Sequence, residues 1–219
     1  YMKKRGAKIN ALRDEYDKER LAFEQKVSER NQEVDALETA YRNGDPEAVC
    51  TYNTMVLERS EYPDGFPQEF RLAYLPEPKE LVIEYELPGV DIVPPVTEYR
   101  YVKTKDVIEE KLRKQTEVKE IYQDVVSAIC LRTIHEVFEA DQANVIGVAV
   151  FNGFVQTIDP STGKDIRPHL ISVRSTKEKF SELNLSRIEK RSCLRNLGAQ
   201  VSSRPEEMQP VKPVVDFNM

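Results

Sequence analysis

The N-terminal segment constrains the fold of this chain most, because its residues favour one long helix. Residues 2–42 contain no proline, and Gly6 is their only glycine. Their apolar residues recur mostly at spacings of three or four, the period of one face of an α-helix. These apolar residues are Ile9, Leu12, Tyr16, Phe23, Val27, Val34, Leu37 and Tyr41. We therefore predict a charged helix over residues 1–44 with one narrow apolar stripe.

A narrow apolar stripe on a charged helix needs a partner helix to cover it. Charged residues occupy two expected stripe positions, Glu19 and Arg30, and they weaken the stripe. One interpretation is a weak or short coiled coil, in which residues 9–41 join copies of the chain or link it to an upstream element. The alternative is a long helix that folds back on its own domain.

A domain with both helices and strands is predicted to begin after this helix, over residues 45–204. Asn43 and Gly44 are typical of a helix C-terminus, since glycine adopts the left-handed cap conformation readily. Asp45 and Pro46 then have the chemistry of an N-cap and a first helical residue. The second helix is expected to end near the turn sequence at residues 62–65.

Strands are predicted over residues 68–75, 80–87 and 97–104. The segment 80–87 alternates between apolar and mostly polar residues, which is typical of a half-buried strand in an antiparallel hairpin. Glu84 and Glu86 would then be exposed on its polar side.

The C-terminal half is predicted to supply a core helix and a second hairpin. Residues 106–141 are helical in pattern, and residues 145–158 and 166–176 are separated by a turn sequence, Asp159–Gly163. Two short helices are expected over residues 177–183 and 186–198, and an extended exit linker over residues 205–219. The predicted fold class is α+β, with a mostly antiparallel sheet packed on the core helix.

Composition restricts the classes of function. The net charge of −6 argues against strong nonspecific affinity of the whole chain for nucleic acid, although a local basic patch stays open. No apolar run approaches the roughly 18 residues that span a bilayer, so no membrane partner is expected. Three scattered cysteines favour a reducing compartment, and we expect a cytoplasmic protein.

The residue patterns of known catalytic centres are missing from the sequence. His135 and His169 are isolated and have no nucleophile motif beside them. Asp106, Glu109 and Lys111 come closest to the acidic pair and lysine of a metal-dependent nuclease, but they lie at the predicted start of a helix. We interpret them as a solvated helix start, and predict no catalytic residue, metal site or cofactor in this segment.

Basic and aromatic residues on strands are the best candidates for a binding site. A first group is Arg100, Tyr101 and Lys103, and a second is Arg167, His169 and Arg174. Arginine beside aromatic side chains on a sheet can bind single-stranded nucleic acid by charge and stacking. The alternative is that these charges protect edge strands from aggregation.

Several stretches carry a resemblance to a known family. They are VIEYELPGVDIVP (82–94), EYRYVKTKD (98–106), LRTIHEVFEAD (131–141), VFNGFVQTIDPSTGKDIRPHLISVR (150–174) and PVVDFNM (213–219). Together they resemble the region upstream of the nuclease in bacterial restriction endonucleases of the Mrr type. The likeness covers roughly residues 45–219.

The resemblance implies a position and a role. In such proteins a charged coiled-coil stretch precedes this domain and the nuclease follows it. The catalytic acidic residues and the glutamine-or-glutamate-x-lysine strand belong to that nuclease, and no residue here matches them. The resemblance therefore implies DNA restriction and phage defence for the parent protein, with Mg²⁺ and DNA bound by the parent.

Three functions follow, in order of preference. The first is a non-catalytic assembly and recognition domain of a restriction endonuclease. The second is a sensor that binds a nucleotide, modified DNA or a phage protein. The third is an independent Mg²⁺-dependent nuclease.

Overall fold

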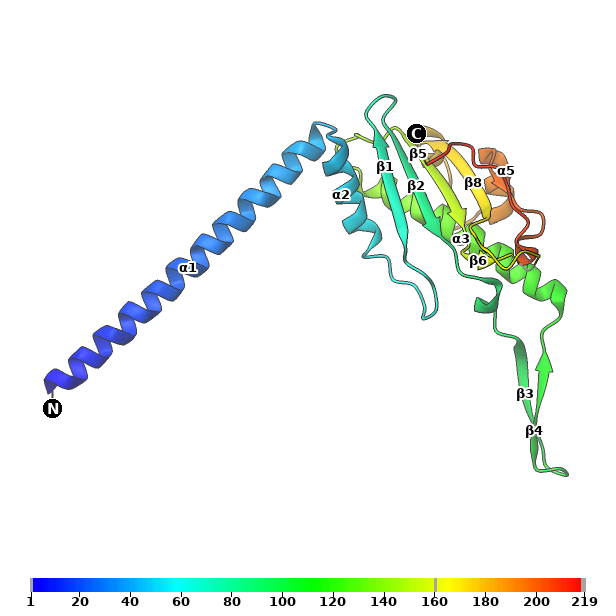
Figure 1. Ribbon diagram of the computed structural model, residues 1–219, viewed down its shortest axis with the longest axis horizontal. Helices are drawn as coiled ribbons and strands as arrows, with labels where there is room; N and C mark the ends of the chain where they lie inside the picture. The colour runs from blue at the N-terminus through cyan, green and yellow to red at the C-terminus, as the bar shows by residue number, and fades with distance from the viewer. Residues whose placement is uncertain (1, 160, 218–219) are drawn as a thin grey trace.

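The N-terminal helix forms one continuous rod. In this computed structural model, which describes residues 2–159 and 161–217, helix α1 runs from Met2 to Arg42. Side chains within the helix are described from Leu12 onward, so that of Ile9 lies outside the described residues. The helix extends away from the rest of the chain and does not fold back on it (Figure 1).

The turn after α1 has the chemistry that the sequence predicts. Gly44 has a φ of 74°, a conformation that glycine adopts without steric cost. Helix α2 (Pro46–Leu57) then begins with Asp45 as its N-cap, whose carboxylate accepts a hydrogen bond from the Ala48 amide at 2.9 Å.

Five strands form the main sheet. Their order is β1-β2-β5-β8-β9, and only the β2–β5 pair is parallel. The α+β class and the mostly antiparallel sheet are thus confirmed. The strands are β1 (Phe70–Leu75), β2 (Glu80–Glu86), β5 (Val148–Phe154), β8 (His169–Thr176) and β9 (Gln200–Val201).

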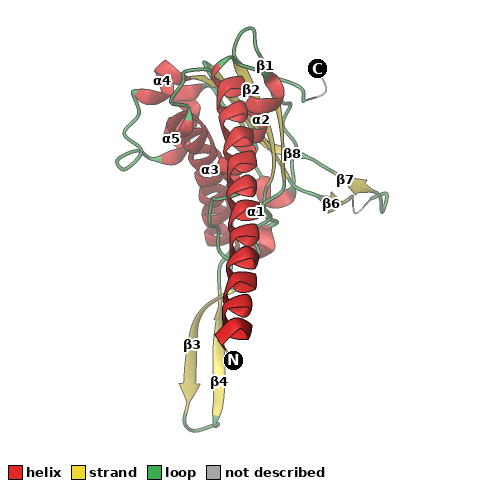
Figure 2. Ribbon diagram, turned by 90° about the vertical axis from the view of Figure 1, so that its left-hand side faces the viewer, coloured by secondary structure: helices red, strands yellow, loops and turns green. Residues whose placement is uncertain are grey.

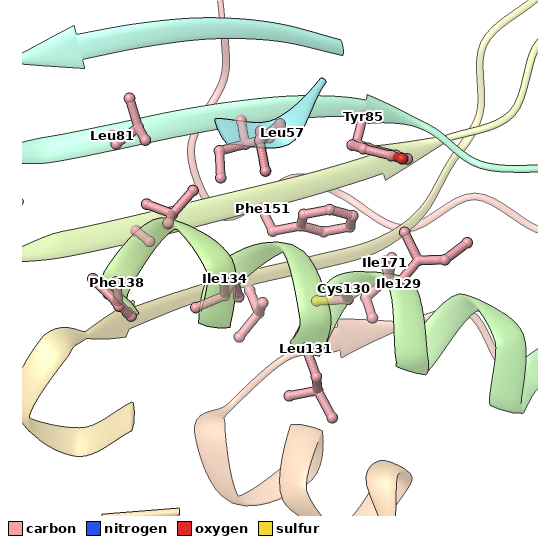
Figure 3. Packing of buried hydrophobic residues seen from close by; sticks show 14 of the residues in the cluster. Leu57, Leu81, Tyr85, Ile129, Cys130, Leu131, Ile134, Phe138, Phe151 and Ile171 are labelled. Atoms are coloured by element: carbon pink, nitrogen blue, oxygen red, sulfur yellow. The ribbon is translucent and has the colours of Figure 1, made fainter. Parts of the chain in front are cut away.

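The core lies between this sheet and helix α3 (Gln115–Ala140). Ile134 and Val137 of α3 and Ile83 and Phe151 of the strands are fully buried. Figure 3 shows Phe151 between β5 and α3. Each such side chain contributes about 1.5–3 kcal/mol of hydrophobic stabilisation.

One helix prediction was wrong at its N-terminal end. Residues 106–114 are not helical: Val107–Leu112 is strand β4, which pairs with β3 (Val96–Val102) in a separate two-stranded hairpin. Asp106 turns the chain with a φ of 52°, and the β-branched Val107 and Ile108 that follow it favour a strand. The hairpin projects from the body of the molecule, by which we mean the main sheet and the helices packed against it (Figures 1 and 2).

The predicted C-terminal hairpin is confirmed, with one refinement. β5 pairs with β8, and the small strands β6 (Thr157–Ile158) and β7 (Asp165–Ile166) extend the pair towards the turn. Pro160 lies outside the described residues. β5 contains a bulge, because the strand continues through Asn152 and Gly153 while its register with β8 shifts after Gly153.

The remaining elements are short. Helix α4 (Lys177–Ser181) and helix α5 (Lys190–Leu197) match the two predicted helices, although α5 begins four residues late, after a Glu189 cap. Two 3₁₀ turns, η1 (Val90–Ile92) and η2 (Pro205–Glu207), complete the structure. Residues 211–215 lie against the sheet.

Candidate functional site

Helix α1 carries a row of apolar side chains that no other part of the described chain covers. Tyr16 is 64% exposed, Phe23 67%, Val27 41% and Val34 49%. Apolar side chains of this size are usually buried. The row therefore has the character of an unoccupied contact surface.

The C-terminal end of the same row enters the body. Tyr41 is buried, its ring centroid lies 4.6 Å from that of Tyr52 in α2, and Leu37 packs against the core. The hydroxyl of Tyr41 donates a hydrogen bond of 2.7 Å to Asp141, at the end of α3. α1 is thus anchored at one end and free along the rest of its described length.

Asp141 is the polar centre of that anchor. Its side chain is fully buried and accepts hydrogen bonds from the amides of Val145 and Ile146, both 3.0 Å, and from Lys177 Nζ at 2.8 Å. Burial raises the pKa of Asp141, but the hydrogen bonds from Lys177, Tyr41 and the two amides outweigh burial and lower it overall. Asp141 is therefore a carboxylate that holds α1, the end of α3 and the start of α4 together.

An apolar groove lies in the angle between α1 and α2. Its volume is about 590 Å³, and Met55, one of its lining residues, is 47% exposed. Val34, Leu37 and Tyr41 line its α1 side, while Tyr52 and Ala143 contribute from the body. The exposed row of α1 is therefore continuous with this groove.

The second predicted group of binding residues lies on the sheet face opposite α3, where it surrounds acidic side chains. Glu84 forms ion pairs with Arg71 and, at 3.9 Å, with Arg167, and its Oε1 lies 3.5 Å from His169 Nε2. The expectation that Glu84 is exposed was wrong, since these three side chains cover it and leave the residue 8% exposed.

Arg174 is likewise paired with a carboxylate. Its Nε donates a hydrogen bond of 2.6 Å to the buried Glu80, four residues before Glu84 on β2. β2 is therefore buried on both faces and not half-buried as predicted, because it has a neighbour on each side and ion pairs above it. The positive charges on this face are largely neutralised within the fold.

The C-terminal segment crosses this face of the sheet (Figure 1). Asn152 Nδ2 donates to the Val215 carbonyl at 2.8 Å, and the Val214 amide donates to Ser172 Oγ at 2.8 Å. Ser172 in turn donates a hydrogen bond to Asn152 Oδ1 at 2.7 Å. The two buried polar side chains thus form hydrogen bonds with each other and with the backbone of the C-terminal segment.

The first predicted group lies on a different element. Arg100 and Tyr101 belong to β3, and Lys103 begins the turn of the β3–β4 hairpin. Figure 1 places the tip of this hairpin well away from β8, so the structure does not bring the two groups together. Arg100 faces Glu109 across the hairpin, and Tyr101 donates a 2.6 Å hydrogen bond to Asp106, which raises the pKa of Tyr101.

The exposed apolar face of this hairpin was not predicted from the sequence. Tyr99 is 67% exposed, Tyr101 56%, and Ile108, which faces Tyr101, 66%. The wrong helix assignment hid this face, because a helix would have placed Ile108 away from the tyrosines. The alternation of apolar and charged residues before and after residues 103–106 is the pattern that indicates the two strands of this hairpin.

Metal-binding clusters and membrane-spanning helices are both absent from the described part of the chain. Residues 12–159 and 161–217, whose side chains are described, contain no group of three or more histidine, cysteine, aspartate or glutamate side chains placed to hold a metal ion. Among the helices described here, none is long and apolar enough to cross a membrane.

Comparisons with known proteins add no family. No protein-family model, no curated protein and no solved structure matches this chain.

Proposed function

We propose that this chain is a non-catalytic assembly and recognition domain of a DNA restriction endonuclease, with the nuclease in a further domain of the same protein. Helix α1 supplies the assembly function, and the β3–β4 hairpin supplies the recognition surface. The nuclease, with its Mg²⁺, acts on DNA in the parent protein.

One observation carries the assembly role: the apolar row of α1 is exposed over most of its described length. Phe23 and Val34 are 67% and 49% exposed although they lie on a helix that is anchored at its end. Covering each such side chain in a partner contributes up to about 1.5–3 kcal/mol. Pairing of α1 with another helix is therefore the favourable way to remove the row from water.

The β3–β4 hairpin supports the recognition role. Its tyrosines and Arg100 project from the body, where a partner reaches them without displacing any other described segment. Exposed aromatic side chains are suited to stacking on bases and to contacts with a protein, and Arg100, on the opposite face of the hairpin, adds a positive charge. A sensor that binds DNA or a phage protein through this hairpin is the second candidate function.

The assembly role is tested by light scattering on the chain and on a form without residues 2–29. This deletion spares Leu37 and Tyr41, which pack against the body, so the body keeps its fold. We expect the chain to form an oligomer whose mass rises with concentration, and the shortened form to be a monomer. If both forms are monomeric throughout the concentration range, the result contradicts the assembly role.

The restriction role is tested in cells that express the intact protein. Phage plating is compared for the intact gene and for a Phe23→Glu, Val27→Glu variant, whose new charges lie on the exposed row. We expect the intact gene to lower the number of plaques and the variant to restore it. Equal plating with the intact gene and with no gene would contradict a role in restriction.

A further inference from the structure

The row on α1 has a heptad register, with positions labelled a to g. Val27, Val34 and Tyr41 lie seven residues apart, and so do Tyr16 and Phe23. The first series occupies the a positions and the second the d positions of a coiled coil. Arginines complete both series: Arg13 and Arg20 fall at a, and Arg30 falls at d.

A parallel pair of α1 helices in this register places like charges together. Equivalent residues face each other in a parallel pair, so Arg13, Arg20 and Arg30 each meet their own copy. At the flanking g and e positions, Glu33 would meet Glu38, and Glu19 would meet Glu24, of the second copy. Five like-charge contacts oppose this orientation.

An antiparallel pair removes all five contacts. The a residues of one helix then face the d residues of the other. With Val34 opposite Phe23 of the second copy, Arg20 faces Leu37 and Arg30 faces Val27, so no arginine meets another arginine. The two-fold axis repeats each contact.

Flanking charges favour this same alignment. Lys26 lies beside Glu33 of the second copy, and symmetry gives the contact twice. The alignment introduces one new like-charged contact, Asp17 beside Glu38, which symmetry also gives twice, and Arg20 Nη2 lies 3.6 Å from Asp17 Oδ1 on its own helix. The aliphatic stem of Arg20 can cover Leu37 while its guanidinium reaches these carboxylates.

The groove between α1 and α2 gives the second copy a place to lie. All the α1 side chains that line it, except Arg42 at a b position, occupy the a, d, e and g positions, which are the ones that contact a partner in a coiled coil. A helix laid on Val34 and Leu37 therefore also covers Met55, which is 47% exposed. In the antiparallel alignment the occupant is the segment around Phe23 of the second copy.

We propose that α1 pairs with α1 of a second copy in antiparallel orientation, with Val34 opposite Phe23 and the groove beside Met55 filled by the partner helix. The proposal rests on the assembly role and specifies its geometry. It places the two bodies at opposite ends of the paired helices, so any attached nuclease domains and recognition hairpins are held apart.

Spin labels on the outer face of α1 test the orientation without changing the paired residues. Cys50 is replaced by serine because it is partly exposed, whereas Cys130 and Cys193 are buried. A label then replaces Lys18 or Gln25, both at f positions. From a rise of 1.5 Å per residue, the antiparallel pair separates the two labels by about 30 Å along the axis at residue 18 and by about 10 Å at residue 25. Equal separations at the two positions would overturn the proposal in favour of a parallel pair.

Cysteine cross-linking tests the alignment. In the Cys50→Ser background, Phe23→Cys and Val34→Cys chains are oxidised alone and as a mixture. We expect a disulfide-linked dimer in the mixture and none in either chain alone. Cross-links in each single variant, or their absence from the mixture, would overturn the alignment. A chain that is a monomer by light scattering refutes the assembly role itself, whereas a dimer with the wrong spacings refutes only this geometry.

Discussion

Asp141 determines how α1 is attached, because a single buried carboxylate accepts hydrogen bonds from three elements. Tyr41 reaches it from α1 at 2.7 Å, and Lys177 reaches it from the start of α4 at 2.8 Å. Such a carboxylate is stable in the interior only while its partners are present. The direction of α1 thus depends on side chains that are distant in the sequence.

Tyr41→Phe removes one of these partners and keeps the ring. Since the lost hydrogen bond is to a buried charge, we expect the free energy of unfolding to fall by about 1.5–3 kcal/mol. Urea denaturation followed by circular dichroism measures the change. Tyr99→Phe is the matched control, because Tyr99 is 67% exposed on the hairpin and lies outside the α1 row, and it should be neutral. A neutral Tyr41→Phe would show that Asp141 does not need this donor.

The lowered pKa of Asp141 gives a pH dependence. Its ordinary value is 3.8, and the folded value lies below it, so the unfolded chain binds the proton more readily. The stabilisation is present above about pH 4 and is lost as the pH falls through the folded pKa. We expect Asp141→Asn to lower the melting temperature at pH 7 and to reduce the loss of stability between pH 4 and pH 2. An Asp141→Asn chain with the same acid-induced loss as the original would contradict this account.

Gly153 is required by packing in β5. A Cβ at this position would lie 2.8 Å from Ile171 Cγ2 and 2.8 Å from Leu87 Cδ1, closer than such atoms approach. We expect Gly153→Ala to destabilise the fold by about 1–3 kcal/mol, as overpacking of a core does. Thermal unfolding measures the change, and an unchanged melting temperature would show that β5 adapts without cost.

At the scale of elements, local chemistry predicted most of the helices and strands. Asn43–Pro46 determined the break between α1 and α2, and the Asp159–Gly163 turn marked the β5–β8 pair. The β3–β4 hairpin was missed because Val107–Leu112 continues directly into a true helical pattern, and charged residues fit either period. The parallel β2–β5 contact joins segments more than sixty residues apart, and no local pattern encodes it.

Charge reversal at the hairpin tests the recognition role. We expect Arg100→Glu with Lys103→Glu to weaken binding of single-stranded DNA about tenfold or more, because each change replaces an attractive charge with a repulsive one. Fluorescence polarisation with a labelled oligonucleotide at fixed salt measures it. Lys164→Glu with Lys212→Glu is the matched control, since it changes the net charge equally on exposed residues elsewhere. Equal affinities of the two variants for the oligonucleotide would show that the hairpin does not bind DNA.

The candidate binding residues were predictable only as residue types. Arg167, His169 and Arg174 have the composition of a basic patch, but Glu84 and Glu80 lie beside them through strand pairing. Pairing across β2, β5 and β8 depends on the whole sheet, so the sequence could not reveal that these charges are matched. Arg100 and Lys103 are on the projecting hairpin, which makes them the better candidates for a partner's contact.

At the scale of the molecule, α1 and the body have different tasks. The body buries its core between α3 and the sheet, while α1 leaves Phe23 and its neighbours to water. The stripe, its spacing and Arg30 within it were predicted from the sequence, whereas the heptad register places Glu19 beside the stripe and Arg13 and Arg20 within it. What the structure adds is the groove beside Met55, because α2 and the end of α3 meet α1 only in the folded chain.

Sedimentation equilibrium on two matched variants is the most direct test of self-association through α1. Phe23→Glu with Val27→Glu places two charges in the row, and Gln25→Glu with Gln32→Glu places the same two charges at f positions. From about 1.5–3 kcal/mol per buried side chain, we expect the first variant to associate at least a hundredfold more weakly than the unmodified chain. The second variant should associate as the unmodified chain does. Equal association of the two variants, or a monomeric unmodified chain, would contradict the account.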